Sequence, residues 1–210
     1  MAHEVLARID DISDFLQGQS AEAEQLGRLP DATAKKLRES GLMRMLQPKE
    51  YGGYEAHPNE FLEAVMATGK HDPATGWIAG VVGVHPWETA MNDDKLQNEL
   101  WSEDQDAWMA SPYAPMGMAI PTEGGYILNG RWSFSSGTDH CNWLVIGAWW
   151  AMLMASPPCR FNPYTSWCRD RTTTSLKILG MSLVCKARAV KMSSLKGLLF
   201  LIIAQLMPLK

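Results

Sequence analysis

Two polar stretches of this 210-residue chain carry residue types that could do chemistry. The first is Ser135-Ser136-Gly137-Thr138-Asp139-His140, a run of small hydrogen-bonding residues between two apolar stretches. Such a run is either the polar lip of a ligand site or a strand end whose side chains bond their own backbone. The second is His85-Pro86-Trp87, which interrupts a long apolar stretch with helical character.

His85 is the strongest candidate for acid–base chemistry. An imidazole titrates near neutral pH, so it can accept or share a substrate proton. A histidine on an apolar helix is more often a satisfied core residue, and that alternative stays open. Because Pro86 removes a backbone donor, the helix should end or kink there. We expect this break to expose a ring nitrogen of His85 to substrate, and Trp87 to close the same pocket.

Other chemistries lack their usual signatures. The sequence contains no HExxH or CxxC pattern and no P-loop or GxGxxG, so we expect neither a metal nor a nucleotide fold of those types. Gly76, Gly80 and Gly83 are spaced for close helix packing. A net charge of −4 disfavours nucleic-acid partners. The longest apolar run, 198–206, is too short to span a bilayer. With four cysteines in no metal spacing and no signal-peptide pattern, we expect a cytoplasmic protein with free thiols.

The elements that must position these residues are helical first and extended afterwards. Apolar residues at helical spacing predict a helix in 3–27. Start and stop signals predict further helices from Pro30-Asp31 to Gly41, from Pro58 to the break at His71-Asp72-Pro73, and in 74–91 and 93–101. After an acidic loop, alternating residues around Asn129-Gly130 predict a β-hairpin. Helical residues 1–105 followed by extended residues 106–149 indicate an α+β fold.

Four separated segments, in this order, resemble one family. They are RLPDATAKKLRESGLMRMLQPKEYGG (28–53), TGWIAGVVGVHPW (75–87), SPYAPMG (111–117) and GGYILNGRWSFSSGTDH (124–140). This series resembles the acyl-CoA dehydrogenase superfamily, and within it the oxygenase components of two-component aromatic hydroxylases that use reduced flavin. The resemblance covers about residues 20–149. It implies an N-terminal helical domain followed by the start of a β-barrel-like middle domain.

The resemblance assigns roles to residues of this chain. Ser136 matches a hydroxyl beside flavin N5, and Phe134 and Ser135 line the same edge. Ser111, Pro112 and Tyr113 match a strand edge that flanks flavin and substrate. Trp77 matches an aromatic wall near the flavin, although a core tryptophan is the simpler interpretation from the residues alone. His85 would take the phenol proton, and His140 would be structural or adjacent to the flavin.

The family further implies a reaction and its partners. Reduced FMN or FAD comes from a separate flavin reductase, and O2 is the co-substrate. The product is a phenol hydroxylated ortho to its OH, in the cytoplasm, by a homotetramer. Two alternatives stay open: an acyl-CoA dehydrogenase-like flavoprotein, and a non-catalytic fragment.

Residues 150–210 depart from the family pattern. Residues 1–150 carry a net charge of −12, whereas residues 151–210 carry +8. Back-translation of the tail, followed by reading in a shifted frame, yields a sequence that resembles the family's continuation. We therefore expect residues 150–210 to be an out-of-frame, poorly structured tail and the family's C-terminal four-helix bundle to be missing. Impaired activity is the expected consequence.

Overall fold

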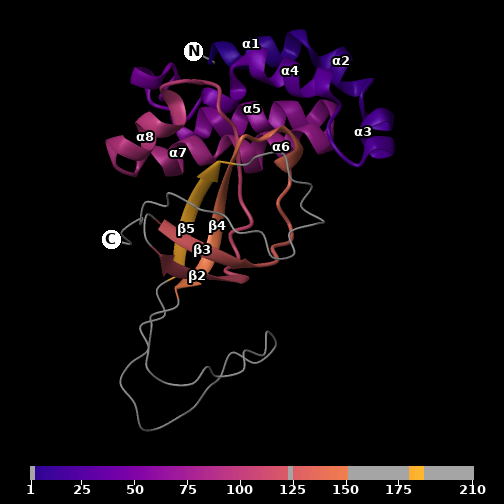
Figure 1. Cartoon of the computed structure of the whole chain (residues 1–210). Helices are drawn as coiled ribbons and strands as arrows, with labels where there is room; N and C mark the ends of the chain where they lie inside the picture. Colours follow the sequence, from indigo (N-terminus) through magenta and orange to yellow (C-terminus); the bar gives the residue numbers. More distant parts are fainter. Residues whose placement is uncertain (1–2, 123–124, 151–179, 187–210) are drawn as a thin grey trace.

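The computed structural model describes residues 3–122, 125–150 and 180–186. Its helices gather in one layer, and the labelled strands lie to one side of that layer (Figure 1). Helices precede strands along the chain, which confirms the α+β class. The helices are α1 Glu4–Asp11, α2 Ser13–Gln17, α3 Ser20–Leu26, α4 Asp31–Ser40, α5 Pro58–His71, α6 Pro73–Gly83, α7 His85–Ala90 and α8 Asp94–Trp101, with 3-10 turns at Leu42–Arg44, Lys49–Tyr51 and Thr138–His140.

The helix boundaries follow the start and stop signals in the sequence. The side chain of Asp72 accepts a hydrogen bond from Thr75 N at the start of α6, and that of Asp93 accepts one from Leu96 N at the start of α8. Gly41 ends α4 in the left-handed conformation, with φ 81°. The single helix expected over 3–27 is wrong, because the structure forms α1, α2 and α3 there with breaks at Ile12 and from Gly18 to Gln19.

Helices α5 and α6 cross at close range. A Cβ atom on Gly76 would lie 2.5 Å from Gly69 Cα, so only glycine fits at this point. The prediction of close packing is therefore confirmed at Gly76. The break at Pro86 is also confirmed: α6 ends at Gly83, and Pro86 occupies the first turn of α7.

Strand β4, Trp143–Trp150, organises the sheet. The other strands are β1 Met109–Ala110, β2 Gly117–Thr122, β3 Gly125–Gly130 and β5 Gly180–Lys186. Strand β5 runs antiparallel along one edge of β4, so β1 and β2, which pair with β4 in parallel near its two ends, share the opposite edge. Residues 111–116 leave the sheet between β1 and β2.

The hairpin expected at Asn129-Gly130 is wrong. The hairpin is formed instead by β2 and β3, with Thr122 opposite Gly125 and Gly117 opposite Gly130. A Cβ atom on either Gly117 or Gly130 would run into the ring of Trp132, at 2.3 and 2.7 Å. This glycine pair lets the Trp132 ring pack on the strand ends, and Trp132 Nε1 donates to Gly147 O across 2.7 Å. Gly130 therefore serves as a packing site rather than as a turn.

The expected absence of regular structure in the tail is wrong at one place. Strand β5 pairs with seven residues of β4, Trp143 to Trp149. An unpaired edge would leave the N–H and C=O groups of β4 without partners, and any extended segment can supply them by its backbone alone. The remaining tail residues, 151–179 and 187–210, lie outside the described residues. The domain limits at 105 and 149 and the proposed frame shift stay predictions.

Candidate functional site

The polar turn that follows β3 is held in shape by its own side chains and by α6. Thr138 Oγ1 donates to Ser135, at 2.6 Å from its carbonyl oxygen and 2.8 Å from its Oγ. Gly137 has φ 82°, and a Cβ atom there would lie 2.7 Å from Val82 Cγ2. Hydrogen bonds within the polar turn therefore explain the presence of Ser135 and Thr138. They do not account for Ser136.

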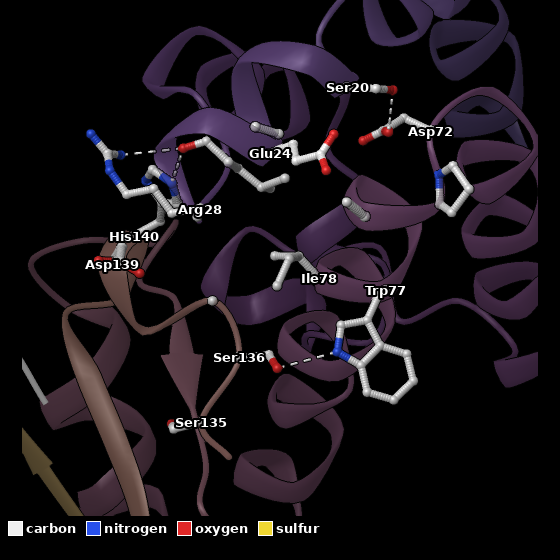
Figure 2. A pocket seen from close by; sticks show the side chains of 16 residues that line it. Ser20, Glu24, Arg28, Asp72, Trp77, Ile78, Ser135, Ser136, Asp139 and His140 are labelled. Atoms are coloured by element: carbon white, nitrogen blue, oxygen red, sulfur yellow. Dashed lines mark hydrogen bonds between the residues drawn. The ribbon is translucent and has the colours of Figure 1, made fainter. Parts of the chain in front are cut away.

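Ser136 faces the helical layer. Its Oγ accepts a hydrogen bond from Trp77 Nε1 at 3.2 Å, across 59 positions of sequence (Figure 2). Because Oγ serves as the acceptor in this bond, its own proton remains available for a ligand acceptor. The Trp77 side chain is 63% exposed, so the interpretation of Trp77 as a core residue is wrong. The structure thus places two of the expected cofactor residues in contact.

A cavity of about 630 Å³ opens beside this pair. That size lies within the range of ordinary ligand pockets. Figure 2 shows its walls, which come from α3, the start of α6 and the polar turn. The lining includes Trp77, Ser135 and Ser136 together with five ionisable side chains: Glu24, Arg28, Asp72, Asp139 and His140.

The ionisable groups of this cavity are mostly bonded to their neighbours. Burial alone would raise the pKa of Asp72, but hydrogen bonds from Thr75, Ser20 and backbone amides hold it below its ordinary value. The Arg28 guanidinium bonds Asp31 at 2.6 Å and lowers the pKa of that exposed carboxyl. His140 Nε2 lies 2.9 Å from Leu29 O, which ties the turn to the segment before α4. The structural role expected for His140 fits this contact.

The second group of expected residues forms a separate cluster around α7. His85 is 1% exposed, and its Nδ1 lies 2.8 Å from Glu88 Oε2. Tyr113 donates its hydroxyl to Glu88 Oε1 at 2.7 Å, and the same hydroxyl lies 3.2 Å from His85 Nδ1. The expectation that the break at Pro86 exposes a ring nitrogen of His85 is wrong, because the break turns the ring into the protein.

Burial raises the pKa of the Tyr113 phenol, and the hydrogen bond to Glu88 raises it further. A neutral phenol is a hydrogen-bond donor, and this one has its acceptor in place. The cluster therefore joins α7 to the segment 111–116 through charge-assisted hydrogen bonds. Glu88 was not among the residues expected from the sequence.

The remaining expected residues lie around these two groups. Ser111 Oγ is buried and has no hydrogen-bond partner among the described residues, which a polar ligand atom could supply. Pro112 O accepts from Gly147 N at 3.5 Å, which holds the segment on β4. Trp87 is half-exposed. Phe134 is 95% exposed and adopts φ 61°, a strained conformation for a bulky residue.

These residues fit a flavin better than a metal. A hydroxyl with a free donor, an indole face, an unpartnered serine and a cavity of this size can hold a planar ring with polar edges. Within 3–122, 125–150 and 180–186, no group of three His, Cys, Asp or Glu side chains could hold a metal ion. Over the same part of the chain, no helix is long and apolar enough to cross a membrane.

Comparison with known proteins places this site in a family context. Residues 7–93 match the family model described as "Acyl-CoA dehydrogenase, N-terminal domain". The solved structure of 3-HSA hydroxylase from Rhodococcus sp. RHA1 superposes with a TM-score of 0.69 at 40% identity, over 72% of this chain and 39% of that one.

Curated relatives match the same part of the chain. The pigment production hydroxylase of Rhodococcus erythropolis is 55% identical over 70% of this chain. The flavin-dependent monooxygenase oxygenase subunit HsaA of Mycobacterium tuberculosis is 40% identical over 70%. The oxygenase component of p-hydroxyphenylacetate 3-hydroxylase from Acinetobacter baumannii is 37% identical over 68%.

The chain spans only 34–38% of the length of these three relatives. Over that length the fold is similar to that of a solved hydroxylase, and the names of the relatives agree on oxygenase chemistry. Residues 7–93 of this chain therefore belong to the family of the acyl-CoA dehydrogenase N-terminal domain, and over the matched part the chain is similar to oxygenase components of flavin-dependent monooxygenases.

Proposed function

We propose that this chain serves in hydroxylation of a phenolic substrate ortho to its OH, with reduced flavin and O2. The observation that carries the proposal is the hydrogen bond between Trp77 and Ser136, which assembles a cofactor edge from two distant segments beside a cavity. The name p-hydroxyphenylacetate 3-hydroxylase describes a phenol hydroxylated next to its OH, and this supports the same class of substrate here.

The flavin edge in this proposal is the polar turn. The bound reduced flavin would supply the electrons that activate O2. Ser136 Oγ keeps a proton and a second lone pair beside the bond from Trp77, so it would hydrogen-bond a polar edge of the ring, and the exposed Trp77 indole would border the bound flavin. The backbone of Phe134 and the braced Ser135 fix the position of Ser136. The protein thus orients the cofactor and excludes water from one side of it.

The substrate side in this proposal is the cluster around His85. His85 holds or shares the phenol proton, which raises electron density at the ortho carbon. The Tyr113 ring lies against the imidazole with 5.5 Å between centroids and its hydroxyl contacts Nδ1, so a phenol would approach the other ring nitrogen, Nε2. Ser111 Oγ then gains the partner that it lacks, and Trp87 and Pro112 border the same space.

The partners follow from this chemistry. A separate reductase supplies the reduced flavin, either FMN or FAD. The assembly implied by the family is a homotetramer. The test varies two things, the phenol and the choice between FMN and FAD.

The test is a coupled turnover assay. The purified chain is mixed with a flavin reductase, NADH, FMN or FAD, and p-hydroxyphenylacetate under ¹⁸O2, and products are analysed by mass spectrometry. We expect an ortho-dihydroxy product that carries one ¹⁸O atom, in a low yield that agrees with the impaired activity expected from the sequence. Ser136→Ala should lower the yield about 10-fold or more, whereas Ser133→Ala, an exposed neighbour, should leave it unchanged. No labelled product with either flavin would defeat the proposal, and flavin reduction by an acyl-CoA would favour a dehydrogenase instead.

A further inference from the structure

Glu88 occupies the centre of the cluster formed with His85 and Tyr113. Each of its two carboxylate oxygens has a different partner: Oε1 accepts from the Tyr113 hydroxyl at 2.7 Å, and Oε2 lies 2.8 Å from His85 Nδ1. Glu88 comes one turn after His85 on α7, whereas Tyr113 follows β1 on a separate segment. The carboxylate is therefore fixed from two directions.

These contacts determine which ring nitrogen of His85 carries the proton. A carboxylate only accepts hydrogen bonds. The single proton of the Tyr113 hydroxyl is given to Glu88 Oε1, so that hydroxyl can only accept from His85. Both neighbours of Nδ1 are thus acceptors, and Nδ1 must be the protonated nitrogen. In a neutral imidazole, Nε2 then carries the free lone pair.

We propose that Glu88 is a positioning residue that holds His85 in the Nδ1–H tautomer, so that Nε2 is left as the acceptor for a substrate proton. Tyr113 assists by fixing the carboxylate. This inference rests on the proposed function for its substrate, a phenol, but its structural content can be measured without turnover. A carboxylate that orients a basic imidazole in this manner is a recurring catalytic device.

The side chain of His85 is buried, so its alternative tautomer would place an Nδ1 lone pair against two acceptor oxygens. That arrangement loses both hydrogen bonds at once. The tautomer therefore tests the geometry of the cluster, and the effect of Glu88→Gln on kcat separates positioning from packing.

The experiment is long-range ¹H–¹⁵N NMR of the purified chain labelled with ¹⁵N-histidine at neutral pH, with His85→Gln used to assign the signal. We expect wild-type His85 to show protonated Nδ1 and unprotonated Nε2. In Glu88→Gln, the amide can donate to Nδ1, so the Nε2–H population should rise about tenfold. Tyr113→Phe should keep the wild-type tautomer, because the Glu88 bond remains. Glu99→Gln, exposed on α8, is the matched control and should change nothing.

Kinetics supply the second readout in the coupled assay. Glu88→Gln should lower kcat about 10- to 100-fold with little change in KM, since it affects proton transfer rather than substrate contacts. A protonated Nε2 in the wild type, or the same tautomer in wild type and Glu88→Gln, would overturn the inference. If the tautomers behave as expected but no phenol is hydroxylated, the proposed function fails while the positioning role of Glu88 stands.

Discussion

The two halves of the candidate site differ in the exposure of their side chains and in the number of hydrogen bonds within them. Around Trp77 and Ser136 the side chains are exposed and a single hydrogen bond joins the helical layer to the polar turn. Around His85 the imidazole is buried although Tyr113 is 52% exposed; one contact joins His85 to Glu88 within α7, and two join α7 to Tyr113 in the segment 111–116. The first half is a surface that a large ligand can cover. The second is a preorganised cluster.

This difference indicates that the fold alone assembles the cluster around His85, whereas the exposed Trp77–Ser136 edge needs a ligand to cover it. Both halves start from the same stretch, because α6 carries Trp77 and its end delivers His85 into α7. A change that moves α6 should therefore damage both. A change in the polar turn should affect only the exposed half, and this asymmetry can be tested.

The largest effect is expected at the contact between the polar turn and α6. Gly137→Ala adds a Cβ atom 2.7 Å from Val82 Cγ2 at a position with φ 82°. Left-handed strain and crowding together should lower the free energy of unfolding by about 2–4 kcal/mol. Urea unfolding measures this loss. Binding of reduced FMN under argon should weaken in the same variant.

Gly27→Ala is the matched control for this variant. Gly27 also has positive φ, 65°, but a Cβ atom there meets nothing within 4 Å. It should cost about 1 kcal/mol from backbone strain alone. Equal losses for the two variants would show that the turn does not depend on its contact with Val82.

The next effect concerns the start of α6, on which both halves depend. Asp72→Ala removes the N-cap of α6 and the partner of Ser20 Oγ, which should cost about 1–2 kcal/mol at pH 7. Because the folded pKa of Asp72 lies below its ordinary value of 3.8, this stability is present above that value and is lost as pH falls through the folded pKa.

Urea unfolding of wild type and Asp72→Ala at a series of pH values measures this dependence. The two curves should converge as pH drops below about 3.8. Asp72→Asn keeps an acceptor for the cap and should lose less at pH 7. A constant difference at every pH would contradict the assignment of the stabilisation to the ionised carboxylate.

The smallest stability effect is expected in the exposed half. Trp77→Phe removes the hydrogen bond to Ser136 and should lower the free energy of unfolding by less than about 1 kcal/mol, since the pair is exposed. Its affinity for reduced FMN should nevertheless fall about 3- to 10-fold. Trp87→Phe, which removes a half-exposed indole from α7, is the control. A similar loss of affinity for reduced FMN in Trp87→Phe would contradict the assignment of the flavin to the exposed half.

Local rules predict the helical layer well and the sheet poorly. The break at His71-Asp72-Pro73, the stop at Gly41 and the break before Pro86 depend on residues adjacent in sequence, and all three are confirmed. The hairpin at Asn129-Gly130 fails because a distant contact, the Trp132 ring on Gly117 and Gly130, decides the use of those glycines.

The candidate site shows the same contrast between features set by neighbouring residues and features set by distant contacts. The motifs identify Ser136, Trp77 and His85 but do not give their burial. From the residues alone a core position was the simpler interpretation of Trp77, and His85 was expected to be accessible, whereas Trp77 is exposed and His85 is buried. Glu88 was missed because a glutamate three residues after a histidine is common on helices. Its meaning comes only from Tyr113, 25 positions later, which the fold brings to its other oxygen.

The central claim is that the Trp77–Ser136 edge receives the flavin. The most direct test is a titration of the ¹⁵N-tryptophan-labelled chain with reduced FMN under argon, in which the Trp77 indole N–H signal is assigned by Trp77→Phe. We expect this signal to shift with saturation while the Trp87 indole, assigned by Trp87→Phe, moves far less. A flavin that saturates the chain and leaves the Trp77 signal in place would contradict the account.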